Sequence, residues 1–215
     1  LLHGSANTIG GQDAVIKLVY GKAARDLILR DGPQGVKFAL GENVTQKRES
    51  NPARFPFTRP GVEAVLVRAF EEARDYQSRR RAYADAIARG QDVPPFRRDL
   101  RLEALSDILD GTIKVHSHCY RADEILMLLR TAERFGIKIQ SLQHVLEGYK
   151  IAAEIAAHGA SNSTFSDWYA YKVEAYDAIP HNAALLTEAG AAVCIKSDSG
   201  EEVRHLYVEA AKMVR

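Results

Sequence analysis

The chain has 215 residues, of which 46% are hydrophobic and 27% charged, so it can form one domain, or a large part of one, around a sizeable core. Its 29 basic and 28 acidic side chains leave a net charge of +1, which gives no electrostatic case for binding nucleic acid or a membrane surface. A membrane-spanning helix needs about 18 consecutive apolar residues, and no apolar stretch in this sequence is that long. The two cysteines, Cys119 and Cys194, make neither a disulfide framework nor a paired-thiolate zinc motif.

The two ends of the sequence predict a fragment. The chain begins without methionine and stops inside a helical pattern. Its first residues lack the basic and apolar regions of a signal peptide. A cytoplasmic and an exported protein are therefore both compatible with this sequence.

Short apolar runs alternate with helical patterns along the first half of the chain. We expect strands at 14–20 and 35–43, a loop over 44–60, and helices over 61–88 and 100–109. The Ile-Gly-Gly sequence at 9–11 is too short for a phosphate-binding loop and is expected to form a turn.

The second half repeats one strand–helix unit. The expected strands cover 111–118, 137–144, 160–165 and 191–199, and the expected helices cover 121–136, 149–159, 180–190 and 201–214. Three of the helices end in a glycine suited to a left-handed cap, at Gly136, Gly159 and Gly190. This alternation predicts an α/β fold with a parallel sheet, either a closed (β/α)8 barrel or an open doubly wound sheet. Both architectures place their active sites at the C-terminal ends of the strands.

Ligand-type side chains stand at or near several of these strand ends, namely Lys37, His116, His118, His144 and Asp198. The alternation of a strand sends His116 and His118 to one face. Nitrogen and carboxylate groups that converge from different strands are typical of a site for Zn²⁺ or a similar divalent ion. A single histidine at a strand end is more often structural, but the recurrence at three ends favours metal.

Three of these stretches resemble the amidohydrolase superfamily, metal-dependent hydrolases built on a (β/α)8 barrel. They are "VHSHCYRADE" (115–124), "LQHVLEG" (142–148) and "IKSDS" (195–199), similar to barrel strands five, six and eight. "SANTIGGQ" (5–12) and "GVKFALGEN" (35–43) look like the imidazolonepropionase-like and prolidase-like branch.

The resemblance covers nearly the whole chain and implies that residues 1–215 form one TIM-barrel-like domain, incomplete at both ends. The family's first strand carries a His-x-His pair, and no such pair occurs in the early part of this chain. Its sole early histidine is His3.

The resemblance implies one or two divalent ions, with zinc as the expected metal, held by side chains from several strands. His118 matches the family's strand-five ligand better than His116 does, and His144 matches the strand-six ligand. Asp198 corresponds to the strand-eight carboxylate that binds metal and acts as general base. Lys37 lies where binuclear members carry a bridging lysine carboxylated by CO₂, although it is equally compatible with an outward-facing lysine.

Further roles follow from the same resemblance. Glu42 is a second candidate for the bridging carboxylate, and His116 could polarise the carbonyl oxygen. Tyr120 and Arg121 are candidates for binding a substrate carboxylate. Arg121 could instead pair with Asp123 or Glu124 at the start of a helix.

The implied reaction is hydrolysis of a C–N bond, in an amide or cyclic amide, by a metal-activated water molecule. The expected partner is then a small-molecule substrate, and the sequence does not distinguish between dipeptides, imidazolones and other lactams. A homo-oligomer is compatible with the sequence. The alternatives are an inactive barrel fragment and a non-catalytic α/β module that binds a ligand. The aromatic stretch over 163–177 either lines the mouth of the pocket or packs under a loop.

Overall fold

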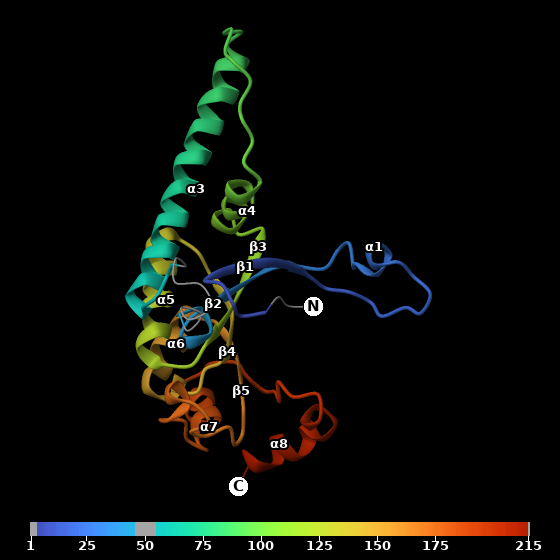
Figure 1. The fold of residues 1–215 in the computed structure, drawn as a ribbon, viewed down its shortest axis with the longest axis vertical. Coiled ribbons are helices and arrows are strands. Elements are labelled where there is room, and N and C mark those ends of the chain that lie inside the picture. Colours follow the sequence, from blue (N-terminus) through green and yellow to red (C-terminus); the bar gives the residue numbers. More distant parts are fainter. Residues whose placement is uncertain (1–3, 46–54, 215) are drawn as a thin grey trace.

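The computed structural model of the chain describes residues 4–45 and 55–214, and its centre is a six-stranded sheet (Figure 1). The strands are β1 Ile9–Ala14, β2 Gln34–Ala39, β3 Ile113–Cys119, β4 Ile139–His144, β5 Ser161–Thr164 and β6 Val193–Ile195. They lie side by side in chain order. β1 is antiparallel to β2, and every other neighbouring pair is parallel.

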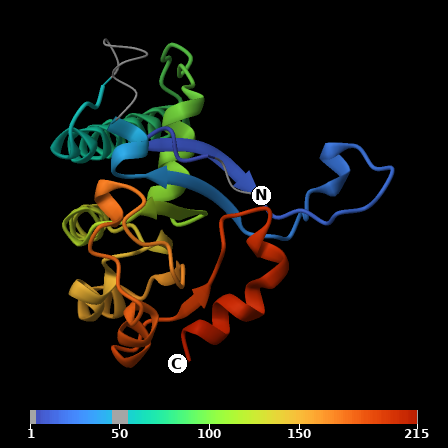
Figure 2. The ribbon, with the colours of Figure 1, turned by 60° about the horizontal axis from the view of Figure 1, so that its bottom comes forward.

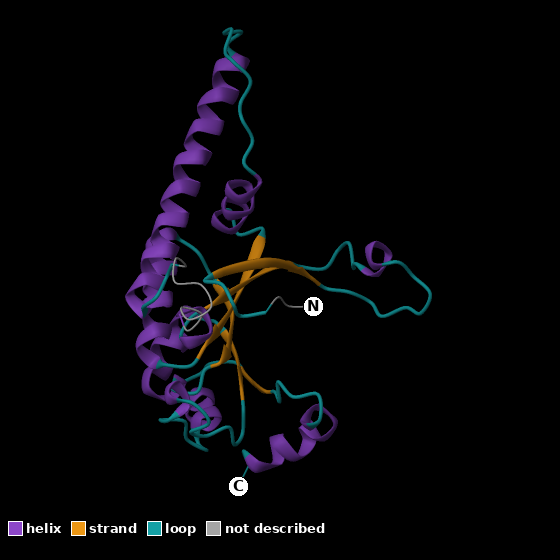
Figure 3. Ribbon diagram, in the orientation of Figure 1, coloured by secondary structure: helices purple, strands orange, loops and turns teal. Residues whose placement is uncertain are grey.

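Helices cover one side of this sheet. α3 (Arg59–Ala88), α5 (Ala122–Phe135), α6 (Ala152–His158) and α7 (Asn182–Glu188) lie on that side, as Figure 3 shows. α8 (Leu206–Lys212) lies on the other side (Figure 2). The shorter helices are α1 Ala24–Leu27, α2 Glu42–Thr45 and α4 Leu100–Leu109, with 3-10 turns at Gly148–Ile151, Val173–Ala175 and Glu202–His205.

Two parts of the chain project from the sheet (Figure 1). The second half of α3 extends beyond it with the segment that returns to α4, and the connection between β1 and β2, which contains α1, extends sideways. Within the described residues, every helix is too short or too polar to cross a membrane.

The main hydrophobic core lies between the sheet and the covering helices. The apolar face predicted for α5, formed by Ile125, Leu128, Leu129 and Ala132, is buried in it. On α3 the buried side chains recur at Val62, Leu66, Ala69, Phe70 and Ala73, which is the spacing of one helical face. The glycine caps are confirmed for α5 and α6, because Gly136 and Gly159 have φ angles of 69° and 76°.

The strand expected at 14–20 is wrong. The first strand lies earlier, at Ile9–Ala14, and includes the Gly-Gly pair that was expected to form a turn. Glycine lowers the β propensity of this segment, but pairing with β2 overrides it. Leu18 and Tyr20 are fully or almost fully exposed, so the apolar run at 14–20 belongs to the projecting connection rather than to the core.

The predicted α/β class with a mostly parallel sheet is confirmed, and the antiparallel β1 is an addition to it. β2, β3 and β4 are parallel neighbours, as the positions of Lys37, His118 and His144 required. β6, which leads to Asp198, is parallel to them and separated from β4 by β5. The edges of the sheet are β1 and β6, so the barrel remains a prediction.

We expect Asp99→Ala to lower the free energy of unfolding by about 1 kcal/mol. Asp99 caps α4, and its Oδ1 accepts hydrogen bonds from the amides of Arg101 at 3.0 Å and Leu102 at 3.1 Å. Asp99→Asn keeps an acceptor at this position and is the matched control. Urea denaturation measures both variants, and equal losses for alanine and asparagine would contradict the capping role.

Candidate active site

A pocket of about 510 Å³ lies at the C-terminal ends of the parallel strands. Five of the predicted site residues line it: Lys37, His118, Tyr120, His144 and Asp198. Gln143 and Lys196 complete much of its polar wall. The side chains predicted to converge from β2, β3, β4 and the segment after β6 therefore do meet in one place.

The two histidines lie side by side in this pocket. Their ring centroids are 4.4 Å apart in an edge-to-face arrangement. Both side chains are buried, and His118 Nε2 and His144 Nδ1 have no hydrogen-bond partner among the described residues. Burial lowers the pKa of His118 to about 2, and it holds the pKa of His144 well below its usual value, with His118 adding to the effect. Both rings are therefore neutral, which is the form that binds metal.

The backbone at the end of β4 explains how Gln143 and His144 reach the same pocket. Adjacent residues of a regular strand point to opposite faces, but His144 has φ 76° and Val145 φ 48°. A left-handed conformation is unfavourable for a β-branched valine, so the surroundings must enforce it. The Val145 amide donates to Cys119 O at 2.9 Å, and Asn182 Nδ2 donates to Val145 O at 2.9 Å.

Aromatic side chains form one wall around the histidines. The Tyr120 ring stacks on His144 with centroids 4.9 Å apart and planes inclined by 7°. Phe165, just after β5, packs on His144 at 5.2 Å, and Trp168 stacks on Phe165 at 4.5 Å. The aromatic stretch at 163–177 therefore contacts the site directly.

Lys37 faces the pocket, so the outward-facing alternative is wrong. Its side chain is buried, and its ammonium nitrogen donates to Gln143 Oε1. Burial lowers the pKa of Lys37, which favours the neutral amine, the form able to react with CO₂. Sequence reasoning missed Gln143, although it directly precedes a predicted ligand at a strand end.

Asp198 reaches the pocket from the turn after β6. It is exposed and has a left-handed φ of 53°. Lys196 lines the same side, with its Nζ 4.8 Å from the centroid of Phe165. Burial lowers the pKa of Lys196 to about 8. Sequence reasoning also missed Lys196, because a lysine near a strand end is also common on exposed surfaces.

Three predicted residues do not line the pocket. His116 is partly buried beside Lys37 in the sheet register, near the charge of Asp13. Arg121 forms a two-pronged ion pair with Asp123, with both N–O distances 3.0 Å, as the alternative for this residue expected. Glu42 begins α2, and its amide binds Glu174 outside the pocket.

The side chains that line the pocket provide some, but not all, of the ligands that a divalent ion needs. Two neutral imidazoles with unpartnered nitrogens are suitable ligands, and a carboxylate lines the same pocket. Over residues 4–45 and 55–214, however, no three His, Cys, Asp or Glu side chains are arranged so that they could hold an ion together. His118 and His144 therefore fit as two ligands, and the third is not assembled with them.

Comparison with known proteins connects this geometry to a family. No family model matches the chain. It is 28% identical over 229 aligned residues to the amidohydrolase tasK of Hapsidospora irregularis, which covers 99% of this chain and 23% of that protein. The crystal structure of an amidohydrolase from Thermotoga maritima MSB8 matches with a TM-score of 0.82 and 29% identity, covering 99% of this chain and 54% of that one. The resemblance to the amidohydrolase superfamily is confirmed.

The match to these amidohydrolases covers nearly all of this chain but only part of each relative. This chain spans about a quarter of the length of the first relative and about half of the second. Nearly all of the chain takes part in both alignments, so the sheet, the covering helices and the pocket belong to the matched region. The particular branch within the amidohydrolases stays a prediction.

Proposed function

We propose that this chain forms part of a metal-dependent hydrolase that cleaves amide or cyclic amide bonds, and that its sheet is part of a (β/α)8 barrel. The observation that carries the proposal is the pair formed by His118 and His144. Each has a buried ring nitrogen without a partner, and both line the pocket that Asp198 also lines. In a chain similar to amidohydrolases, metal binding accounts for two unsatisfied nitrogens that otherwise destabilise the fold.

The residues of the chain have distinct roles in the proposed reaction. His118 and His144 would hold a divalent ion, which would supply Lewis acidity toward water and the scissile carbonyl. A carboxylate oxygen of Asp198 takes a proton from the attacking water as the new C–O bond forms. Asp198 then delivers this proton to the leaving nitrogen as the C–N bond breaks. Tyr120 and Phe165 pack on the His144 ring and restrict its orientation.

Lys37 has a conditional role in this proposal. Its buried side chain lies on β2, in the pocket with the two histidines. If its neutral amine adds to CO₂ and releases a proton to solvent, the resulting carbamate would supply oxygen ligands for a second ion. One zinc per chain would then indicate an uncarboxylated Lys37, and two would indicate the carboxylated form.

Zinc binding tests the proposal directly. After dialysis against Zn²⁺, elemental analysis of the purified chain should find about one or two ions per chain. His118→Asn should weaken binding by at least about 100-fold, because even the loss of a group behind a ligand weakens binding by 10–100-fold. His116→Asn is the matched control: it removes a histidine from the same face of β3, and zinc binding should persist.

The other outcomes are equally informative. Zinc binding lost in His116→Asn and retained in His118→Asn would make His116 the ligand. An absence of zinc in the wild-type protein would favour the non-catalytic ligand-binding module. Zinc without hydrolysis of dipeptides or cyclic amides would favour an inactive fragment.

A further inference from the structure

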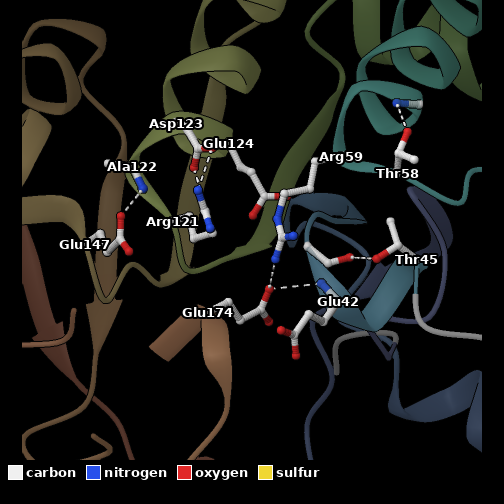
Figure 4. Close-up of polar contacts among 12 residues, drawn as sticks. Glu42, Thr45, Thr58, Arg59, Arg121, Ala122, Asp123, Glu124, Glu147 and Glu174 are labelled. Carbon is white, nitrogen blue, oxygen red and sulfur yellow. Dashed lines mark hydrogen bonds and ion pairs between the residues drawn. The ribbon is translucent and has the colours of Figure 1, made fainter. Parts of the chain in front are cut away.

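A buried group of charges lies outside the pocket, where the connections after β2, β3 and β5 meet (Figure 4). Arg59, the first residue of α3, lies between two carboxylates. Its Nε is 3.3 Å from Glu124 Oε1, in the first turn of α5, and its Nη2 is 3.4 Å from Glu174 Oε2. We call Arg59, Glu124 and Glu174 the Arg59 cluster.

Both carboxylates of the Arg59 cluster are almost inaccessible to solvent. Glu124 is 3% exposed and Glu174 1% exposed. Neither oxygen of Glu124 forms a hydrogen bond, because its contact with Arg59 has the distance of an ion pair without hydrogen-bond geometry. Arg59 is thus placed between two buried carboxylates, and taking these charges out of water costs free energy that their ion pairs must offset.

Glu174 is fixed more tightly than Glu124. Its Oε2 accepts a hydrogen bond from the Glu42 amide at 2.9 Å, and its Oε1 is 2.5 Å from Lys172 Nζ. The backbone makes room for this carboxylate at Gly41, where φ is 75° and a Cβ atom would overlap Glu174 Oε2. Glu174 therefore anchors its own connection, the one after β5, to the connection after β2.

The segment that Glu174 anchors forms the aromatic wall of the pocket. We call residues 165–177 the wall loop. In it, Tyr171 donates a hydrogen bond to the Tyr120 hydroxyl at 2.7 Å, and Lys172 Nζ lies 3.9 Å from the centroid of the Tyr120 ring. Tyr120 in turn stacks on His144. A continuous series of contacts thus connects Glu174 to a pocket histidine.

We propose that the Arg59 cluster positions the wall loop against Tyr120, and that the charge on Glu124 sets how firmly the loop is held. Arg59, Glu124 and Glu174 are then positioning residues, since they act on the pocket through Tyr171 and Lys172. This inference concerns the position of the loop, and it stands or fails independently of hydrolysis.

The direction of the effect follows from the charged and titratable groups around Glu124. The charged groups are Arg59 from α3, Glu174 from the wall loop, and Asp123 and Arg121 beside Glu124 in the chain. The thiol of Cys119 on β3 also faces Glu124, and it is neutral because burial raises its pKa. Burial raises the pKa of Glu124 to about 7; Arg59 opposes this shift, and Glu174 and Asp123 add to it. Protonation of Glu124 removes its repulsion of Glu174 and leaves Arg59 to Glu174 alone. The wall loop should therefore be held more firmly below pH 7 than above it.

Trp168 reports on this loop without any need for activity. It is the single tryptophan of the sequence, it stacks on Phe165, and it contacts Tyr171 edge-to-face at 5.4 Å. Acrylamide quenching of its fluorescence should increase as pH rises, with a midpoint near 7. In Glu124→Gln this step should disappear, and quenching should stay at the low-pH value of the wild-type protein.

Two further variants separate positioning from simple structural support. Glu174→Gln removes the charge that binds Arg59 and Lys172, so quenching should be high at every pH. Glu202→Gln is the control, because Glu202 accepts a hydrogen bond from Trp168 Nε1 at 3.2 Å and lies outside the Arg59 cluster. Its pH step should remain. Circular dichroism confirms that each variant is folded.

Comparison of the pH step in Glu124→Gln and Glu202→Gln tests the proposal even if Glu174→Gln does not fold. A pH step that persists in Glu124→Gln, or that is lost only in Glu202→Gln, would overturn the proposal. So would a wild-type protein whose Trp168 quenching is the same across this pH range.

Discussion

Asp198→Asn should lower kcat by about 10²–10⁴-fold, the usual contribution of general-base catalysis, with a smaller change in KM. The substitution keeps the size of the side chain and removes its charge and basicity. Asp198 lines the pocket together with His118 and His144, where an attacking water would need a proton acceptor. Steady-state kinetics on a substrate of the wild-type enzyme, with metal content measured in parallel, gives both constants.

The structure removes two alternative explanations for such a loss. Asp198 has a left-handed φ of 53°, a conformation that asparagine adopts as readily as aspartate, so the backbone is not strained by the change. A capping carboxylate is also not lost, because the following helical turn is capped by Ser199, whose Oγ accepts hydrogen bonds from the amides of Glu201 at 3.3 Å and Glu202 at 3.2 Å.

Ser199→Ala is therefore the control for Asp198→Asn. It weakens the start of the helical turn at Glu202–His205 and leaves the carboxylate of Asp198 in place, so kcat should change by only a few-fold. Near-normal turnover of Asp198→Asn with full metal occupancy would remove this residue from the mechanism.

The helices α4 and α5 were predictable because their signals are local. α4 occupies the expected residues 100–109, since Asp99 caps it and apolar residues follow at helical spacing. α5 begins and ends within one residue of its expected limits, where Gly136 caps it in a left-handed conformation. These signals lie within a few residues of each boundary, so one sequence is enough to find them.

The first strand was not predictable in the same way. β1 contains two glycines and two polar residues, a composition that favours a turn. Its conformation depends on pairing with β2, which lies beyond the long projecting connection. Conversely, the apolar run at 14–20 is a good strand by composition and forms none, because it is not paired along its length. Propensity is decisive only where tertiary contacts do not oppose it.

The residues of the candidate site whose position depends only on the ends of the strands were predictable. The order of strands brings His118, His144 and Asp198 to one end of a parallel sheet, and they do line one pocket. The left-handed turn at His144 and Val145 is a different case, because a valine gives no sign of such a conformation. That turn accounts for His144 lining the same pocket as its strand neighbour Gln143, which binds Lys37. The Arg59 cluster was equally hidden, since its three residues are far apart in the sequence.

Glu124→Gln should make the protein more stable than the wild type at pH 8 by up to about 3 kcal/mol, and equally stable at pH 4. The pKa of Glu124 rises from an ordinary value of 4.5 to about 7, mainly because the side chain is buried. A difference of about 2.5 pKa units corresponds to about 3 kcal/mol at 1.36 kcal/mol per unit.

The sign follows from the protons bound in each state. Between pH 4.5 and about 7 the folded protein keeps a proton on Glu124 that the unfolded chain has lost. The stability associated with this group is therefore fully present below pH 4.5, and it is lost as pH rises through 7. Glutamine stays neutral and resembles the protonated acid, so the variant does not lose this contribution.

Urea denaturation of both proteins at several pH values between about 4 and 8 measures the effect as a difference. All other titrating groups are shared by the two proteins and cancel to a first approximation. The difference should be near zero at pH 4 and should grow through the interval in which Glu124 loses its proton. A constant difference at all pH values would mean that the pKa of Glu124 is the same in the folded and the unfolded protein. In that case the ion pair with Arg59 offsets the effect of burial, and Glu124 is charged on both sides of pH 7, so its charge cannot regulate the wall loop there.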